Sequence, residues 1–266
     1  MTEPSPSARR GQDLRPVALI TGASRGVGAA VARALAPSHD LLLGGRDTAA
    51  LAALAAELPG SRPWPIELTD TVEVVEATGG IDRLDALVHS AAVVAPGTVA
   101  DTKAAVWRRH FDVNVVAVAE LTRLLLPALR AACGRVVILN PGTDLRGQPG
   151  WASLVACSQA LSGFAEVLRA EEGPRVRVTS IHAGHLGAPA EPDAVLRPES
   201  IAGAVLLSVT APDDAVLSDM VLHPAARTTS DPFAVVDRET SDFRRTLPAQ
   251  HAATVERGSV RTGEQR

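Results

Sequence analysis

The sequence predicts an α/β fold in a single domain, with a doubly wound parallel sheet of about seven strands and helices on both faces. Two observations lead to this prediction. Short apolar runs alternate with longer segments of helical period, and 46% of the 266 residues are hydrophobic, enough to bury one full-size core. The expected strands are Val17–Thr21, Asp40–Gly44, Arg62–Glu67, Leu84–Ser90, Arg135–Asn140, Arg175–Ile181 and Val216–Leu222.

The two ends of the chain lack this alternation. Residues 1–15 and 225–266 are rich in Arg, Ser, Thr, Glu and Pro and show no sustained period. We therefore expect a mobile N-terminal tail, a folded domain over residues 16–224, and a polar C-terminal tail.

Composition limits the partners and the compartment. A formal net charge of −4 gives no basic footprint for a nucleic acid, so we expect no such partner. Two cysteines are too few for a disulfide framework, and the first residues lack the apolar segment of a secretory signal, so we expect a cytoplasmic protein. We expect no membrane span, because three charged residues interrupt the most apolar helix candidate, Val113–Cys133. The seven histidines do not combine with other ligands at metal-binding spacing.

A glycine-rich motif follows the first expected strand and leads into an alanine-rich helix. It reads Thr21-Gly22-Ala23-Ser24-Arg25-Gly26-Val27-Gly28. Glycines at such a turn let the backbone approach a pyrophosphate, and the helix N-terminus offers unpaired N–H groups. The motif predicts a dinucleotide site; the alternative is a tight turn that binds nothing.

An arginine follows the second expected strand, in Gly44-Gly45-Arg46-Asp47. A protein that binds unphosphorylated NAD would be expected to carry an acidic residue there, against the ribose diol. Arg46 and Arg25 would instead grip a ribose 2′-phosphate through charge-assisted hydrogen bonds, which favours NADP(H) as the cofactor. The alternative is that both are solvated surface arginines.

With these motifs the sequence resembles the short-chain dehydrogenase/reductase (SDR) family from about Pro16 to Pro224. The glycine loop matches the family's TGxxxGxG pattern, and Glu67-Leu68 stands where the family has Asp-Val or Asp-Leu beside the adenine. His89-Ser90-Ala91-Ala92 stands where the family has NNAG. The resemblance implies a Rossmann-like fold in which Glu67, Leu68, Ser90 and Ala91 contact the cofactor.

The resemblance also locates the family's catalytic positions. Asn114 matches the asparagine that kinks the long helix and holds a water of the proton relay, whereas Pro141, Leu154 and Ser158 stand at the positions of the family's serine, tyrosine and lysine. None of these three residues can perform the catalytic role of the residue that the family has at its position. The chain has no tyrosine, and its only lysine is Lys103, so this holds in any alignment. General acid catalysis contributes roughly 10²–10⁴-fold, and we expect carbonyl reduction by the usual route to be very slow or absent.

Other groups are candidates for relocated chemistry. His182 and His185 follow the sixth expected strand, at the carboxyl edge of the sheet, and a histidine exchanges protons near neutral pH. His89 is expected to make a structural or cofactor-side hydrogen bond, and Thr143 and Asp144 to belong to a hydrogen-bonded loop.

Three functional hypotheses follow. The first is a descendant of the family that binds NADP(H) without redox chemistry, either alone or as an inactive subunit in a homo- or hetero-oligomer formed through the helices Val113–Cys133 and Trp151–Glu172. The second is an enzyme with relocated catalytic groups, such as an NADPH-dependent reductase or a redox-neutral cyclase, isomerase or dehydratase. The third is a degenerate enzyme without selected activity. In each case Trp151 and Leu154 predict a cleft suited to a small apolar molecule.

Overall fold

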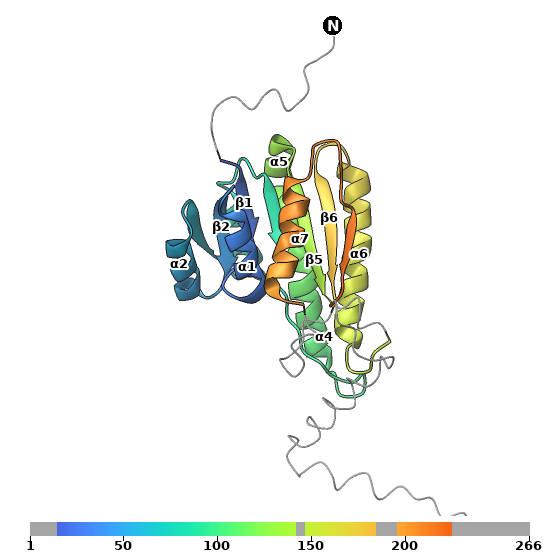
Figure 1. The fold of residues 1–266 in the computed structure, drawn as a ribbon. Helices are drawn as coiled ribbons and strands as arrows, with labels where there is room; N and C mark the ends of the chain where they lie inside the picture. Colours follow the sequence, from blue (N-terminus) through green and yellow to red (C-terminus); the bar gives the residue numbers. More distant parts are fainter. Residues whose placement is uncertain (1–14, 142–146, 185–195, 225–266) are drawn as a thin grey trace, which may run out of the picture. The chain divides into compact units, whose positions relative to one another are not determined.

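The computed structural model describes residues 15–141, 147–184 and 196–224, which all lie in the first of two compact units of the chain, residues 1–227. Apart from Arg15, the two expected tails lie outside the described residues. One sheet of seven parallel strands has the order β3-β2-β1-β4-β5-β6-β7 (Figure 1). The strands are β1 (Val17–Ile20), β2 (Asp40–Gly45), β3 (Ser61–Pro65), β4 (Ala86–His89), β5 (Arg135–Pro141), β6 (Arg177–Ala183) and β7 (Asp219–Leu222).

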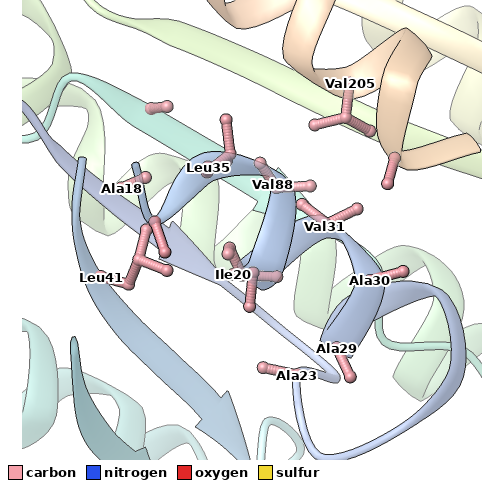
Figure 2. Close-up of a cluster of buried hydrophobic side chains, with 14 of the residues drawn as sticks. Ala18, Ile20, Ala23, Ala29, Ala30, Val31, Leu35, Leu41, Val88 and Val205 are labelled. Carbon is pink, nitrogen blue, oxygen red and sulfur yellow. The ribbon is translucent and has the colours of Figure 1, made fainter. Parts of the chain in front are cut away.

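Helices cover both faces of this sheet. They are α1 (Gly26–Leu35), α2 (Thr48–Glu57), α3 (Thr71–Thr78), α4 (Ala104–Phe111), α5 (Ala117–Ala132), α6 (Ala152–Glu172) and α7 (Pro198–Thr210). The core residues of α1, α2 and α7 pack on one face, and those of α3, α5 and α6 on the other. Figure 2 shows the first of these layers, where Val31 and Leu35 of α1 lie over Ala18 and Ile20 of β1, with Val205 of α7 beside them. The predicted α/β fold is confirmed.

The seven expected strands are all present, but their ends differ. The expected strand Val216–Leu222 is too long, because pairing with β6 begins only at Asp219, opposite Ser180. The expected strand Arg175–Ile181 starts too early and stops too early, since β6 pairs with β5 from Arg177 to Ala183. Apolar runs predict where a strand lies, whereas hydrogen-bond partners set its ends.

The segment expected as one helix, Val113–Cys133, is divided. Five residues form a π-helical segment, η2 (Asp112–Val116), between α4 and α5, and Asn114 lies in it. Of the described helices, none is long and apolar enough to cross a membrane.

The sheet order reverses at the neighbouring strands β1 and β4. From β1 the chain proceeds outward to β2 and β3, then returns to β4 on the other side of β1. In open parallel sheets the crevice at such a reversal, beyond the carboxyl ends of the strands, is where ligands bind. The fold therefore places the loops after β1 and β4 side by side at this edge.

An ion pair between the exposed Arg130 side chain and the buried Glu172 joins the C-terminal ends of α5 and α6. Arg130 donates two hydrogen bonds to the Glu172 carboxylate, from Nε at 2.8 Å and from Nη2 at 2.5 Å. The Glu172 side chain is only 4% exposed. The hydrogen bonds from Arg130 hold the pKa of Glu172 below its ordinary value of 4.5.

We expect Glu172→Gln to lower the free energy of unfolding at neutral pH by about 1–3 kcal/mol, because it removes the charge that accepts both hydrogen bonds. A carboxyl whose pKa is depressed by folding stabilises the protein above its unfolded pKa, and this contribution is lost as the pH falls through the folded pKa. The difference from the wild-type chain should therefore shrink below the ordinary pKa of 4.5. Urea unfolding at a series of pH values measures both effects. The exposed neighbour Glu171 gives the matched control, Glu171→Gln, which should change little. Equal losses in the two variants would contradict the role of the pair.

Candidate functional site

An open cleft of about 470 Å³ lies beyond the carboxyl ends of β1, β2, β3 and β4. Its wall comes from the loops after these four strands, together with side chains from α4 and η2. The lining residues are Gly22, Ser24, Arg25, Gly26, Val27, Gly28, Gly45, Arg46, Asp47, Ile66, Glu67, Leu68, Ser90, Ala91, Ala92, Val93, Arg109 and Val113. The cleft thus occupies the position that the reversal of strand order predicts.

Two glycines bring the loop after β1 against its neighbours. Gly22 has φ +69°, and a Cβ there would lie 2.9 Å from the backbone N and Cα of Ala91. A Cβ on Gly28 would lie 2.2 Å from the carbonyl oxygen of Gly22. No side chain fits at either position, so these glycines are required by close packing as well as by the turn.

The N-terminus of α1 opens on the cleft. Arg25 is the N-cap residue and its side chain makes no capping hydrogen bond, while Gly26, Val27 and Gly28 of the first turn line the cleft. The unpaired N–H groups and the positive dipole end of a helix favour an anion at this place. The cradle therefore fits the pyrophosphate of a dinucleotide.

Thr21 fixes the floor of this cradle. Its side-chain Oγ1 accepts hydrogen bonds from the backbone N–H groups of Ser90 (3.1 Å) and Ala91 (3.2 Å). Its own backbone N–H donates to the carbonyl of Val88 at 3.0 Å. The end of β1 is thereby tied to the loop after β4.

Charged side chains gather at the end of the cleft formed by β2 and β3. Arg25 and Arg46 are exposed, and Arg46 Nη1 lies 3.5 Å from Glu67 Oε2. Asp47 uses its carboxylate to cap α2, accepting a hydrogen bond from Ala50 N at 3.0 Å. Partial burial pushes the pKa of Glu67 upward, but hydrogen bonds from Thr69 and the nearby charges of Arg46 and Arg109 outweigh it, and the pKa is lowered.

Eleven of the twelve residues predicted to bind the cofactor line the cleft, and Thr21 lies beneath it. Sequence analysis did not identify Arg109 and Val113, which enter the cleft from α4 and η2. Their i,i+4 spacing on one helical face, next to Asn114, is the signal that could have found them.

Comparison with known proteins identifies the family. The family model described as "short chain dehydrogenase" matches residues 16–195. The chain belongs to the short-chain dehydrogenase family.

Several known proteins resemble this chain over more than half of its length. Nodulation protein G of Rhizobium sp. (strain N33) is 33% identical over 166 residues, which cover 59% of this chain and 67% of that protein. Carbonyl reductase (NADPH) 2 of Sus scrofa is 29% identical over 169 residues, covering 62% of this chain and 69% of that protein. The solved structure of a metagenomic short-chain oxidoreductase in complex with NADP is 27% identical, with a TM-score of 0.72, and covers 80% of this chain and 98% of that chain.

Asn114 holds the loop after β4. Its Oδ1 accepts a hydrogen bond from Val93 N at 2.7 Å, and its Nδ2 donates to Val93 O at 2.8 Å. Val93 and Val113 both line the cleft, whereas Asn114 is buried behind them. The asparagine therefore shapes the cleft wall through the backbone.

The positions that the resemblance assigns to the family's serine, tyrosine and lysine lie at β5 and α6. Pro141 ends β5, and Leu154 and Ser158 are 2% and 1% exposed on the sheet-facing side of α6. Asn140 Nδ2 donates hydrogen bonds to the Ser158 carbonyl (3.0 Å) and to Ser162 Oγ (3.1 Å). In the described residues, this part of α6 offers neither a phenol nor a cation to a substrate.

The histidine candidates have different surroundings. His182 Nε2 lies 3.1 Å from Asp219 Oδ1 on β7, and His182 does not line the described cleft. His185, Thr143 and Asp144 lie outside the described residues. Burial lowers the pKa of His89 to about 3. The Thr122 hydroxyl donates to the Val118 carbonyl, so it accepts from His89 Nε2–H at 2.9 Å; this is the structural role predicted for His89.

Another buried histidine, His110, was not singled out from the sequence. His110 Nδ1 lies 2.8 Å from Ser153 Oγ, joining α4 to the first turn of α6. One turn further along both helices, Asn114 is hydrogen-bonded to Cys157, whose pKa burial raises to about 11. A thiol with such a pKa is not a nucleophile at neutral pH. Among the described residues no cluster of three or more His, Cys, Asp or Glu side chains could hold a metal ion.

We expect Gly28→Ala to lower the free energy of unfolding by about 1–3 kcal/mol, because the new Cβ meets backbone that cannot move away without shifting the loop. The matched control is Gly163→Ala on α6, where a Cβ would have no neighbour within 4 Å. Alanine is the better helix former, so this variant should gain about 0.5–1 kcal/mol. Chemical unfolding of both variants measures the difference. A shift of the same sign in both would show that the loop is not packed as described.

Proposed function

We propose that this chain is an NADP(H)-binding member of its family that does not carry out tyrosine-dependent hydride transfer. It acts as a cofactor-binding protein or as an inactive subunit of an assembly. The proposal rests on a contrast between two parts of the fold. The cleft has the residues of a dinucleotide cradle, whereas α6 carries Leu154 and Ser158 in place of the family's tyrosine and lysine.

The residues of the cleft support NADP(H) as the ligand. The first turn of α1 and the glycine loop would hold the pyrophosphate, and Leu68 and Val113 give the cleft apolar surface for the adenine. Arg25 and Arg46 would hold the 2′-phosphate that distinguishes NADP(H) from NAD(H). Two proteins similar to this chain, carbonyl reductase (NADPH) 2 and the metagenomic oxidoreductase, carry NADPH or NADP in their names.

The loss of hydride transfer rests on proton chemistry. A bound NADPH would supply a hydride, but a carbonyl also needs a proton donor at its oxygen. Leu154 has no titratable proton, and Ser158 has no charge that could lower the pKa of a donor. The buried positions of both residues are compatible with packing in place of catalysis.

Assembly and location belong to the same proposal. Val116 of η2 and Val167 of α6 are 56% and 57% exposed, which supports a homo-oligomer or a hetero-oligomer with a relative through these helices. Light scattering of the purified chain, alone and with such a relative, tests this, and a monomer in both samples would contradict it. We further propose a cytoplasmic protein without a nucleic-acid partner.

We expect calorimetric titration to give micromolar binding of NADPH and weaker binding of NADH. Arg46→Ala should weaken NADPH binding about tenfold, since charge-assisted hydrogen bonds contribute about 1.5–3 kcal/mol and Arg25 remains. The same variant should leave NADH binding nearly unchanged. Arg62→Ala, at an exposed arginine of β3 that does not line the cleft, is the matched control. Absence of NADPH binding at millimolar concentration would overturn the proposed function.

We expect the wild-type chain to oxidise no NADPH with a panel of aldehydes and ketones. The triple variant Pro141→Ser, Leu154→Tyr, Ser158→Lys restores the three missing groups and should show measurable turnover. The matched control carries Leu154→Phe in place of Leu154→Tyr, which keeps the ring but has no proton to donate. NADPH consumption by the wild-type chain would contradict the proposed loss and favour an enzyme with relocated groups.

A further inference from the structure

The arginine assigned to the 2′-phosphate already has an anionic partner within the cleft. Arg46 Nη1 lies 3.5 Å from Glu67 Oε2, and both side chains line the cleft. Glu67 is held in place, because its other oxygen, Oε1, accepts hydrogen bonds from Thr69 N (3.2 Å) and Thr69 Oγ1 (2.9 Å). Glu67 thus presents a fixed carboxylate to a long and mobile guanidinium side chain.

This pair opposes phosphate binding in two ways. Arg46 must leave or share the Glu67 carboxylate before it can form a two-point contact with a phosphate. A phosphate beside Arg46 would also lie near the negative charge of Glu67, and like charges repel. Neither effect touches NADH, which has no 2′-phosphate.

Arg109 provides a second cation on the α4 side of the cleft. It lines the same cleft, and its charge is near enough to the Glu67 carboxylate to favour the ionised form. The pKa of Glu67 is lowered, despite partial burial, by Thr69, Arg46 and Arg109. The carboxylate therefore remains ionised at neutral pH, so the competition for Arg46 persists there.

We propose that Glu67 is a specificity-determining residue that competes with the 2′-phosphate of NADPH for Arg46. Arg109 is the alternative partner of Glu67, and it compensates the carboxylate when Arg46 turns to the phosphate. This inference rests on the proposed function, because it requires that the cleft bind NADPH.

The test is a calorimetric double-mutant cycle with NADPH and NADH at one fixed ionic strength. Glu67→Gln keeps a carbonyl oxygen as a hydrogen-bond acceptor but removes the charge. It should raise the ratio of NADPH affinity to NADH affinity by roughly two- to five-fold, the range expected for an exposed ion pair, because any change at the adenine alters the binding of both cofactors alike. Glu76→Gln on α3, outside the cleft, is the matched control for the change of charge.

The Arg109 variants test whether Arg109 acts on NADPH binding through Glu67 or by direct contact with the phosphate. Arg109→Gln should weaken NADPH binding by roughly two-fold, because Glu67 then holds Arg46 more strongly, and it should have no effect when Glu67→Gln is also present. The neighbouring Arg108→Gln, at an exposed residue outside the cleft, controls for the long-range field.

Each outcome has one meaning. A ratio of NADPH affinity to NADH affinity that does not respond to Glu67→Gln, or an equal effect of Arg109→Gln in both backgrounds, would overturn this inference and leave the proposed function intact. Absence of NADPH binding by the wild-type chain would overturn both.

Discussion

The close approach of the loop after β1 to the end of β4 is the constraint on which the cleft depends. The hydroxyl of Thr21 binds two N–H groups of the β4 loop, and Gly22 leaves no room for a side chain between them. Gly28, in the first turn of α1, packs equally closely against the carbonyl oxygen of Gly22. Because this packing is between backbone segments, it fixes the N-terminus of α1 at the point where the strand order reverses. The unpaired N–H groups of the helix and the N-cap Arg25 therefore lie at the cleft.

The strands and the glycine cradle were predictable because their signals are local. A strand buried on both faces needs a short apolar run, and a loop that touches backbone needs glycine, so both can be recognised within a few consecutive residues. The ends of β6 and β7 could not be read in this way. They depend on how far the neighbouring strand offers hydrogen-bond partners, which is a property of the sheet.

The contacts between helices in the site could not be predicted from the sequence. Arg109 of α4 and residues of the loop after β3, far apart in the sequence, line the same cleft, and His110 meets Ser153 across 43 positions of sequence. Nothing in the order of residues states these distances. Asn114 could be recognised in the sequence through its family motif, but only the structure shows its two hydrogen bonds to Val93.

The cradle and the family's catalytic positions depend on different parts of the sheet. The proposed loss of the catalytic side chains therefore costs the fold little stability. The cradle is built on β1 to β4, while Pro141, Leu154 and Ser158 belong to β5 and α6. α6 packs on the sheet through residues such as Leu161 and Leu168, and Leu154, earlier on the same helix, is also buried. A buried tyrosine would need a partner for its hydroxyl, and a buried lysine would need a counter-charge, whereas leucine needs neither. The proposed exchange of tyrosine for Leu154 therefore removes a requirement from the fold, whereas the buried Ser158 hydroxyl has no hydrogen-bond partner among the described residues. Neither position contributes a hydrogen bond that shapes the dinucleotide cradle.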